Sequence, residues 1–392
     1  MDAAASWQRG SVFFLFTLSA GYAMYALDRS ILSSVLSVME TDLSLTKTEV
    51  GFLGSAQYAG VLAVVMFAGY ISDLIGRKKI MLAGLTIFTV FTWMIGFAQN
   101  FFSAFLFRLI SGVGEGLFWP VAMAAVAERF AGKKGISLGI FHVGFDAGSI
   151  AGVTAGALAF TFLGSWRYAF LLPPLAAIPV IVAMLLTDEV RVRKEKEDTG
   201  SRSSAVLQVV KKKEVNAIMV FAFLATWASV WQSVFLPYYF YKVMHFSVLP
   251  SALLSSLVLA SGALGKASMG KVSDLIGREK ALLISSLLVV LAYLVFFFVP
   301  YFEISFGGAL VMGFFSSSVF PVMQALATEY AGKMTGSSLG LTTTSQSVAT
   351  VLAPALSGYL FYLGVGRALS LDAVIPSALM SVIAVHLVFR KK

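Results

Sequence analysis

The chain has 392 residues, of which 58% are hydrophobic and only 12% are charged, with a net charge of +9 and a mean hydropathy of +0.85. Soluble domains are roughly one-quarter charged, so a water-soluble fold has too little interior for this many apolar side chains. The composition excludes a soluble protein and makes a lipid bilayer the solvent. Anionic lipid headgroups account for the positive charge, and a nucleic-acid partner is not needed.

Twelve stretches are long and apolar enough to cross a bilayer as helices, which takes about 20 mostly apolar residues each. They are continuously apolar rather than alternating, which excludes a transmembrane β-barrel and predicts an all-α integral membrane protein. The first run is too long, and carries too much charge, for a cleavable signal peptide. The predicted spans are 11–39, 49–72, 80–98, 101–127, 136–164, 168–187, 215–243, 248–272, 281–299, 304–328, 336–363 and 373–389.

Lys and Arg residues set the expected orientation, because cytoplasmic loops carry an excess of them. With a cytoplasmic N-terminus, the loops on the opposite side hold only Lys47, Arg167, Lys242 and Arg367. Both termini are therefore expected in the cytoplasm of a multi-pass protein. The absence of cysteine and of N-x-S/T sequons is compatible with a plasma (inner) membrane.

The first predicted span carries two charges in its middle. The string ALDRS places Asp28 and Arg29 among apolar residues, where a charge is costly and by default functional. Adjacent residues on a helix point about 100° apart, so one can face a cavity while the other faces a neighbouring helix. Tyr25 on this span, and Gln57 and Tyr58 on the second, are candidate substrate-binding residues.

A charged string with two glycines ends the second span. GYISDLIGRKK begins at Gly69 and includes Asp73, Gly76 and Arg77. The glycines permit a tight turn or close helix approach, and Asp73 can cap a helix end or pair with Arg77. These four residues are consistent with a topology signal and a turn, and the family resemblance given below implies that they also form a conformational latch.

The fourth and fifth spans add further charges. Arg108 and Glu115 are seven residues apart, and His142 and Asp146 are four apart, so each pair shares one helix face. An internal salt-bridge network is the alternative to a functional site. The glycines of GSIAGVTAG, from Gly148, are expected to let the fifth helix pack closely on a neighbour.

The chain repeats itself. GKVSDLIGREK begins at Gly270, 201 residues after the first such string begins, and the same offset maps Pro120 onto Pro321. The repeat predicts two parallel six-helix bundles, residues 1–187 and 215–392. The polar segment 188–214 is expected to link them on the cytoplasmic side.

The second half repeats the latch residues but not the membrane charges. Its latch consists of Asp274, Gly277 and Arg278, with Glu279 in place of a basic residue. Both halves are expected to share one fold, so charges that occur in only one half are not required by that fold. Residues Asp28, Arg29, Arg108, Glu115, His142 and Asp146 map onto Ser229, Val230, Ala309, Ser316, Thr343 and Ser347.

The second half offers weaker candidates for substrate binding. Trp231 and Gln232 lie in the seventh span, Lys266 in the eighth and Gln346 in the eleventh. Two of them have structural alternatives: Lys266 can reach toward the headgroups, and Gln346 can bond to a neighbouring helix. The tyrosines of the seventh span fit an interfacial aromatic belt.

These motifs resemble known transporter sequences. The parallel repeat and the string G-x-x-x-D-x-x-G-R-[KR] resemble the major facilitator superfamily, whose substrate site lies between the halves. YALDRSILS, RLISGVGEGLFWP and SWRYAF resemble motifs of the anion:cation symporter family, and spinster-like lysolipid transporters share the first two. The resemblance implies that Asp28 and Glu115 exchange protons while Arg29 and Arg108 contact an anion.

Several roles follow from that resemblance. The proton is the expected coupling ion, with His142 and Asp146 as further proton-coupling residues, although an acid at Asp146 departs from sugar-acid members. Ionised Asp28 is expected to pair with Arg29 or Arg108, and its protonation to free that cation for the substrate.

The sequence predicts a secondary active transporter of a small organic anion that works by alternating access to the two sides of the membrane. Without an HExxH motif or a phosphate-binding loop it lacks the signatures of an enzyme. No cofactor or metal is expected. The expected partners are a small-molecule substrate and membrane lipid, with the chain acting as a monomer. A lysolipid transporter and a non-transporting sensor remain alternatives.

Overall fold

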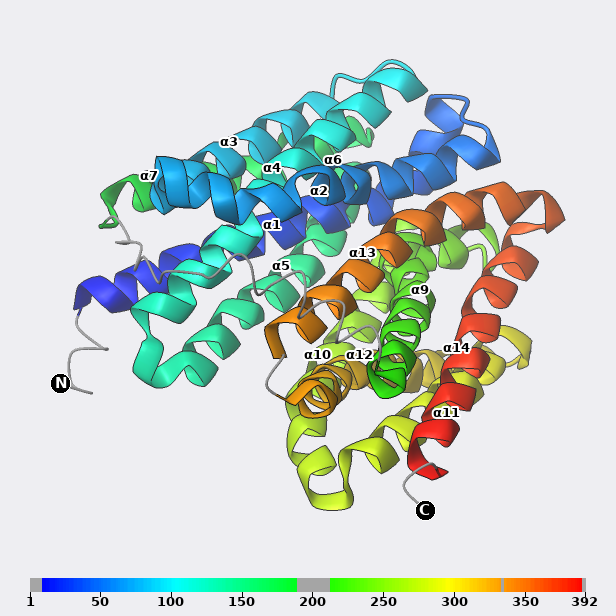
Figure 1. Cartoon of the computed structure of the whole chain (residues 1–392). Coiled ribbons are helices and arrows are strands. Elements are labelled where there is room, and N and C mark those ends of the chain that lie inside the picture. Colours follow the sequence, from blue (N-terminus) through cyan, green and yellow to red (C-terminus); the bar gives the residue numbers. More distant parts are fainter. Residues whose placement is uncertain (1–8, 189–211, 333–334, 390–392) are drawn as a thin grey trace. The chain divides into compact units, whose positions relative to one another are not determined.

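The computed structural model describes residues 9–188, 212–332 and 335–389 (Figure 1). Almost all of the predicted linker, 188–214, lies outside these residues. All regular secondary structure in the described ranges is helical, which confirms the predicted fold class. Helices are expected because lipid offers no hydrogen-bond partners to the backbone, and a helix satisfies its own.

The chain folds as two compact units. The first consists of residues 1–194 and 240–253, and the second of residues 195–239 and 254–392. The elements of the first unit are α1 (Arg9–Asp42), α2 (Lys47–Ile75), α3 (Arg77–Ile95), α4 (Phe101–Arg129), η2 (Ala131–Lys133), α5 (Lys134–Leu163), α6 (Arg167–Leu171), η3 (Pro173–Ala176) and α7 (Ala177–Leu186).

Helices α9 and α10 begin and end in different units, because their adjoining ends, residues 240–253, belong to the first. The elements after residue 212 are α9 (Lys213–Lys242), α10 (Val248–Ile276), α11 (Arg278–Phe298), α12 (Phe302–Ala331), α13 (Thr335–Leu360), η5 (Phe361–Leu363) and α14 (Val365–Phe389). Those from α11 onward lie wholly in the second unit.

Eleven helical segments in the described ranges are long and apolar enough to cross a membrane. The predicted span 336–363 corresponds to α13, which is long enough at 26 residues but contains the polar string LTTTSQS. The predicted span 168–187 is one membrane-crossing segment, Arg167–Leu186. It is broken into α6, η3 and α7 rather than continuous, because Pro173 and Pro174 lack backbone N–H donors.

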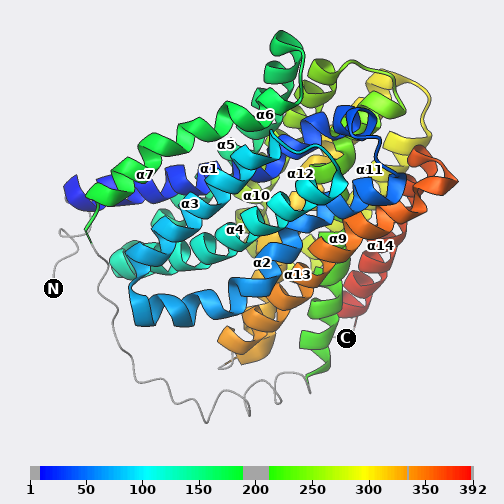
Figure 2. The ribbon, with the colours of Figure 1, turned by 90° about the horizontal axis from the view of Figure 1, so that it is seen from above.

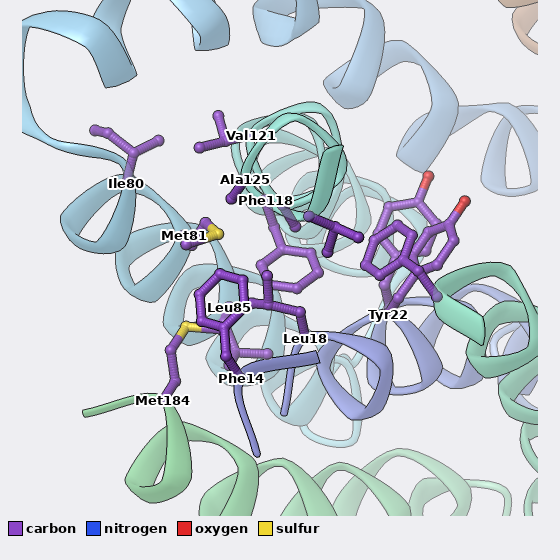
Figure 3. Close-up of a cluster of buried hydrophobic side chains, with 14 of the residues drawn as sticks. Phe14, Leu18, Tyr22, Ile80, Met81, Leu85, Phe118, Val121, Ala125 and Met184 are labelled. Atoms are coloured by element: carbon purple, nitrogen blue, oxygen red, sulfur yellow. The ribbon is translucent and has the colours of Figure 1, made fainter. Parts of the chain in front are cut away.

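An apolar core fills the first unit between α1, α3, α4 and α7 (Figure 3). Phe14 and Leu18 of α1 pack with Leu85 of α3, Phe118 of α4 and Met184 of α7, and all five are buried. This core fixes α1 against α4, and these two helices carry Asp28, Arg29, Arg108 and Glu115 in the same unit.

Glycines bring α5 directly onto α1, and the two helices run side by side in both views (Figures 1 and 2). A Cβ added at Gly144, Gly148 or Gly152 would collide with a backbone carbonyl of α1. The backbone of Ala23 lies against Gly148 in this way. The expected close packing of the fifth helix is therefore confirmed, and its partner is α1.

Candidate functional site

Five of the predicted site residues come together inside the first unit. We call Asp28, Arg29, Gln57, Arg108 and Glu115 the Gln57 cluster. They come from α1, α2 and α4, and all but Arg29 are buried. Helix α1 supplies both adjacent charges, which reach different partners, as their divergence on the helix predicts.

The amide of Gln57 lies at the centre of this cluster. Its Nε2 donates to Asp28 Oδ2 at 3.1 Å and to Glu115 Oε1 at 2.9 Å, while its Oε1 accepts from Arg108 Nη2 at 2.5 Å. The opposite orientation of the amide would turn its oxygen toward two carboxyl groups and its NH₂ toward a guanidinium. Gln57 therefore joins both acids to Arg108.

Asp28 forms no ion pair with either arginine in the described structure, so the pairing expected of ionised Asp28 with Arg29 or Arg108 is not observed there. Its Oδ2 instead accepts from Ser111 Oγ at 2.6 Å and from Gln57. Its Oδ1 has no hydrogen-bond partner among the described residues. Asp28 also lines a small cavity with Thr92 and neighbouring residues of α3 and α7.

Arg29 pairs with Glu115, the acid on the facing helix. Its Nη2 lies 3.0 Å from Glu115 Oε2. The guanidinium carbon lies 4.8 Å from the ring centre of Tyr25 and 4.5 Å from that of Tyr58, so both predicted tyrosines contact it. The Arg29 side chain is 18% exposed, against 0% for Glu115, so the arginine forms the accessible edge of the cluster.

The two arginines keep unused hydrogen-bond donors. Arg29 Nε, Arg108 Nε and Arg108 Nη1 are buried and have no hydrogen-bond partner in the described ranges. Unpaired buried N–H groups of a charged side chain are costly. These donors suit an additional acceptor, and the planar guanidinium group favours a carboxylate or phosphate.

His142 and Asp146 lie on α5 beside the aromatic residues of α1. The His142 ring stands edge-on to Tyr22 with centroids 5.7 Å apart, and Tyr22 lies 5.2 Å from Tyr25. His142 is exposed and Asp146 half-buried. An aromatic chain thus leads from His142 to Tyr25, which contacts Arg29.

The second unit holds the other predicted substrate-binding residues, but they do not form one cluster. Trp231 is fully buried and packs against Tyr293 and neighbouring phenylalanines. Gln232 donates to Tyr293 Oη at 2.5 Å and to Ser316 Oγ at 3.2 Å. Lys266 on α10 and Gln346 on α13 are half-buried.

The sequence interpretation missed a buried acid, Asp372. It lies on α14 and accepts a 2.7 Å hydrogen bond from Trp227 Nε1 of α9. The sequence feature that could have revealed it is a single carboxylate directly before an apolar run. The predicted span began at residue 373, whereas the helix begins at Val365, so Asp372 was assigned to a loop.

The predicted latch residues of the first unit gather around Arg77. Its Nη2 lies 2.7 Å from Glu128 Oε1 of α4 and 3.6 Å from Asp73 Oδ1. Gly76 has a φ of 108°, which provides the turn between α2 and α3. A Cβ at Gly69 would meet nothing within 4 Å, so close helix approach there is not observed in the described structure.

The second unit repeats this arrangement with more exposure. Arg278 lies 3.3 Å from Asp274 and 2.8 Å from Glu329, and Gly277 has a φ of 90°. The Arg278 side chain is 29% exposed, against 8% for its counterpart in the first unit. Glu279 accepts a hydrogen bond from Tyr330.

Neither unit holds a candidate metal site within the described ranges, where no three His, Cys, Asp or Glu side chains are grouped to hold an ion. The Gln57 cluster pairs its two acids with two arginines and an amide. Carboxyl, amide and guanidinium groups of this kind can exchange protons and donate hydrogen bonds to anions.

Comparisons with known proteins give relatives of several transport functions. Multidrug resistance protein 3 of Bacillus subtilis is 27% identical over 213 residues, covering 54% of this chain and 41% of that protein. A sphingosine-1-phosphate transporter of Xenopus tropicalis is 25% identical over 248 residues, covering 62% and 48%. The matched segments thus span less than half the length of either relative.

Solved structures share the fold at low sequence identity. A bacterial homologue of the human lysosomal transporter Spinster, inward-facing and unoccupied, gives a TM-score of 0.76 at 17% identity and covers 97% of this chain and 95% of its own. The family model described as Major Facilitator Superfamily matches residues 18–304 and 218–392, which together take in nearly the whole sequence. The chain therefore belongs to the Major Facilitator Superfamily.

Proposed function

We propose that this chain is a secondary active transporter that couples protons to the movement of a small organic anion by alternating access. The observation that carries the proposal is the pair of arginines with unused donors, Arg29 and Arg108, beside two membrane carboxyl groups. A carboxylate can accept two parallel hydrogen bonds from one guanidinium group, which gives both affinity and orientation.

Arg29 is the better placed of the two to meet a substrate first. It is the part-exposed member of the Gln57 cluster, and the rings of Tyr25 and Tyr58 contact its guanidinium group. Apolar rings lower the local dielectric, which strengthens attraction between the guanidinium and an anion. The tyrosines also offer hydrophobic surface to the body of an organic acid.

Glu115 provides the coupling. It and a substrate carboxylate compete for the same Arg29 guanidinium, because Glu115 Oε2 already accepts from Nη2. A proton on Glu115 removes its negative charge and releases Arg29 to the substrate. Glu115 therefore holds the arginine that Asp28 was expected to hold, while Asp28 acts on the cluster through Gln57.

Matched acid and neutral ligands test the proposal. Nicotinate and nicotinamide, or gluconate and sorbitol, have similar shapes but differ in charge. We expect at least one acid of a wider carboxylate panel to raise the melting temperature of the purified protein, more at low pH, while its neutral partner does not. Uptake of that acid into proteoliposomes should be driven by an inward proton gradient.

The variants for this test are Arg29→Ala and Arg367→Ala. Arg367 is an exposed arginine on α14 and serves as the control. Loss of the acid response in the first variant alone is expected. Equal responses to acids and neutral partners, or equal effects of both variants, would show that the arginine cluster does not recognise an anion.

An anionic amphiphile is the second candidate substrate, favoured by the likeness to a sphingosine-1-phosphate transporter. Its phosphate could occupy the same arginine donors. Lysophosphatidate and lysophosphatidylcholine in the same thermal-shift screen separate the two candidates. Stabilisation by lysolipids alone would favour the amphiphile, and stabilisation by water-soluble acids alone would favour the small anion.

We further propose a plasma-membrane location with both termini in the cytoplasm, a monomeric state, and two functional halves, 1–187 and 215–392, joined by 188–214. The distribution of Lys and Arg among the loops supports the orientation. The proposed roles of Lys266 and Gln346 in substrate binding rest on their polarity inside helical spans.

A further inference from the structure

A buried carboxyl group in the second unit has no part in the function proposed above. Asp372 of α14 is 5% exposed. Trp227 Nε1 of α9 donates to its Oδ1, and its Oδ2 lies against the hydroxyl of Ser357 on α13. No Lys, Arg or His of the described residues forms an ion pair with Asp372. The residue 201 positions earlier is Leu171, so the fold does not require an acid there.

The hydroxyl of Ser357 has two acceptors to serve and only one proton. Its Oγ lies 2.9 Å from the backbone oxygen of Ala353, and also within hydrogen-bond distance of Asp372 Oδ2. If Asp372 is ionised, Ser357 can donate fully to only one of these oxygens. Ala353 O also accepts a backbone N–H within α13, as helix carbonyls do, so the oxygen that lacks a full donor is the charged Oδ2 of Asp372, which is costly in a low-dielectric interior.

A neutral Asp372 satisfies every group. Its own O–H donates to Ser357 Oγ, the Ser357 hydroxyl donates to Ala353 O, and Trp227 N–H donates to the carbonyl oxygen of Asp372. Each donor then has one acceptor, and no negative charge remains without a counter-ion in the membrane. The hydrogen-bond geometry therefore fits the protonated acid.

The surrounding titratable groups do not supply a counter-charge. On α14 itself, Arg367 and His386 are exposed. From α11, Tyr293 is the group within electrostatic range of Asp372, and its hydroxyl donates to the backbone of Ala228. Tyr359 of α13 is exposed.

Other titratable groups on the packed elements lie further along their helices. Tyr238 of α9 is buried against Phe361 of η5, and Tyr362 of η5 is exposed. The charged residues Lys213, Glu214, Arg278, Glu279 and Lys280 stand at the first turns of α9 and α11.

We propose that Asp372 is a proton-binding site of the second unit, occupied in this conformation and separate from the Gln57 cluster. Trp227 and Ser357 hold the neutral acid, and Asp372 releases its proton when either contact is lost or when a cation enters. The half-buried Trp227 indole covers the carboxyl group and is the contact most readily lost. The site does not depend on the substrate of the proposed function.

Infrared difference spectroscopy on the full chain in lipid nanodiscs tests the proposal directly. A protonated carboxyl group gives a separate C=O stretching band that shifts in D₂O. We expect Asp372→Asn to remove one such band. Asp274→Asn, which changes an exposed aspartate paired with Arg278, should keep it. Glu115→Gln should also keep it, which separates this site from the proposed coupling residue.

Ser357→Ala gives a second reading of the same band. Removal of the hydroxyl takes away the acceptor of the Asp372 O–H, so the band should shift to higher frequency rather than vanish. The proposal is overturned if no band is lost in Asp372→Asn at any pH at which the protein is folded. It is equally overturned if the band is unmoved in Ser357→Ala.

Thermal unfolding provides an independent measurement. The amide of Asp372→Asn can donate to Ser357 and accept from Trp227, so it imitates the protonated acid. We expect its melting temperature at low pH to match that of the unmodified chain, and to change less as pH rises. A large loss of stability at low pH in Asp372→Asn would show that the site requires the ionised acid.

Discussion

Arg108 donates a 2.5 Å hydrogen bond to the side-chain oxygen of Gln57, and not to Glu115 two turns along its own helix. The amide nitrogen of Gln57 then reaches Glu115 and Asp28. A neutral side chain therefore connects three charged ones. A change in the protonation of either acid can pass to Arg108 through this one amide.

Replacing Gln57 by leucine should disable transport without unfolding the protein. Four side-chain hydrogen bonds are lost, and an unpaired buried polar group costs about 1–3 kcal/mol. We therefore expect uptake to fall at least tenfold, which corresponds to roughly 1.4 kcal/mol. Gln232→Leu is the matched control, because its amide contacts Tyr293 and Ser316 and no charged group. Equal losses of uptake in the two variants would contradict a special role for Gln57.

Glu115→Gln should separate substrate exchange from the proton gradient. The amide keeps a hydrogen bond to Arg29 but carries no exchangeable charge, so counterflow should continue while gradient-driven uptake is lost. The two assays are run on the same proteoliposomes. Wild-type rates in both would place the coupling proton on another residue.

Asp28→Asn and Arg29→Ala should differ in how they change substrate binding. The neutral amide introduced by Asp28→Asn would mimic a protonated acid, so binding should depend less on pH between about 5 and 8 than in the unmodified chain, while Glu115 keeps the remaining dependence. Removal of the Arg29 guanidinium should weaken binding at every pH. Isotherms across the range measure both, and a wild-type pH dependence in Asp28→Asn would exclude Asp28 from coupling.

The latch residues should affect turnover more than affinity. Arg77 is 8% exposed and held by Glu128 at 2.7 Å, so Glu128→Gln should lower the rate of uptake severalfold with little change in ligand-induced stabilisation. Glu329→Gln is the matched variant, and its effect should be smaller because Arg278 is more exposed. Lost ligand stabilisation with normal turnover per bound substrate would contradict a latch.

Gly148→Val should destabilise the first unit, because the new side chain would meet the backbone of Ala23 and force α5 away from α1. Gly139→Ala on the same helix is the control, since a Cβ there meets nothing within 4 Å. We expect a clear drop in melting temperature for Gly148→Val and none for Gly139→Ala. The loss in free energy of unfolding for Gly148→Val should exceed the roughly 1–3 kcal/mol typical of overpacking. Similar melting temperatures of the two variants would show that the contact between α5 and α1 can adjust to a larger side chain.

The fold was largely predictable because apolar runs, the 201-residue repeat and the basic loops are all properties of sequence alone. The exceptions have local causes. Pro173 and Pro174 interrupt the sixth span, and α14 begins at Val365 rather than at the predicted residue 373, which hid Asp372. Helix ends in lipid depend on caps and packing that hydropathy does not record.

The candidate site was predictable in its members but not in its connections. Charges such as Arg29 and Glu115 stand out in an apolar sequence, and spacing within one helix relates Arg108 to Glu115. The pairing of Arg29 with Glu115, and the central place of Gln57, depend on contacts between α1, α2 and α4. A single sequence shows which residues share a helix face, but not which faces meet.

The glycine contacts between α1 and α5 have a consequence for motion. Backbone packed on backbone has no side chains that can rearrange, so we expect the two helices to move together. Asp28 and Arg29 on one helix, and His142 and Asp146 on the other, then keep fixed separations throughout a transport cycle. The distance between a spin label on α1 and one on α5 is accordingly expected to stay constant while other distances in the protein change.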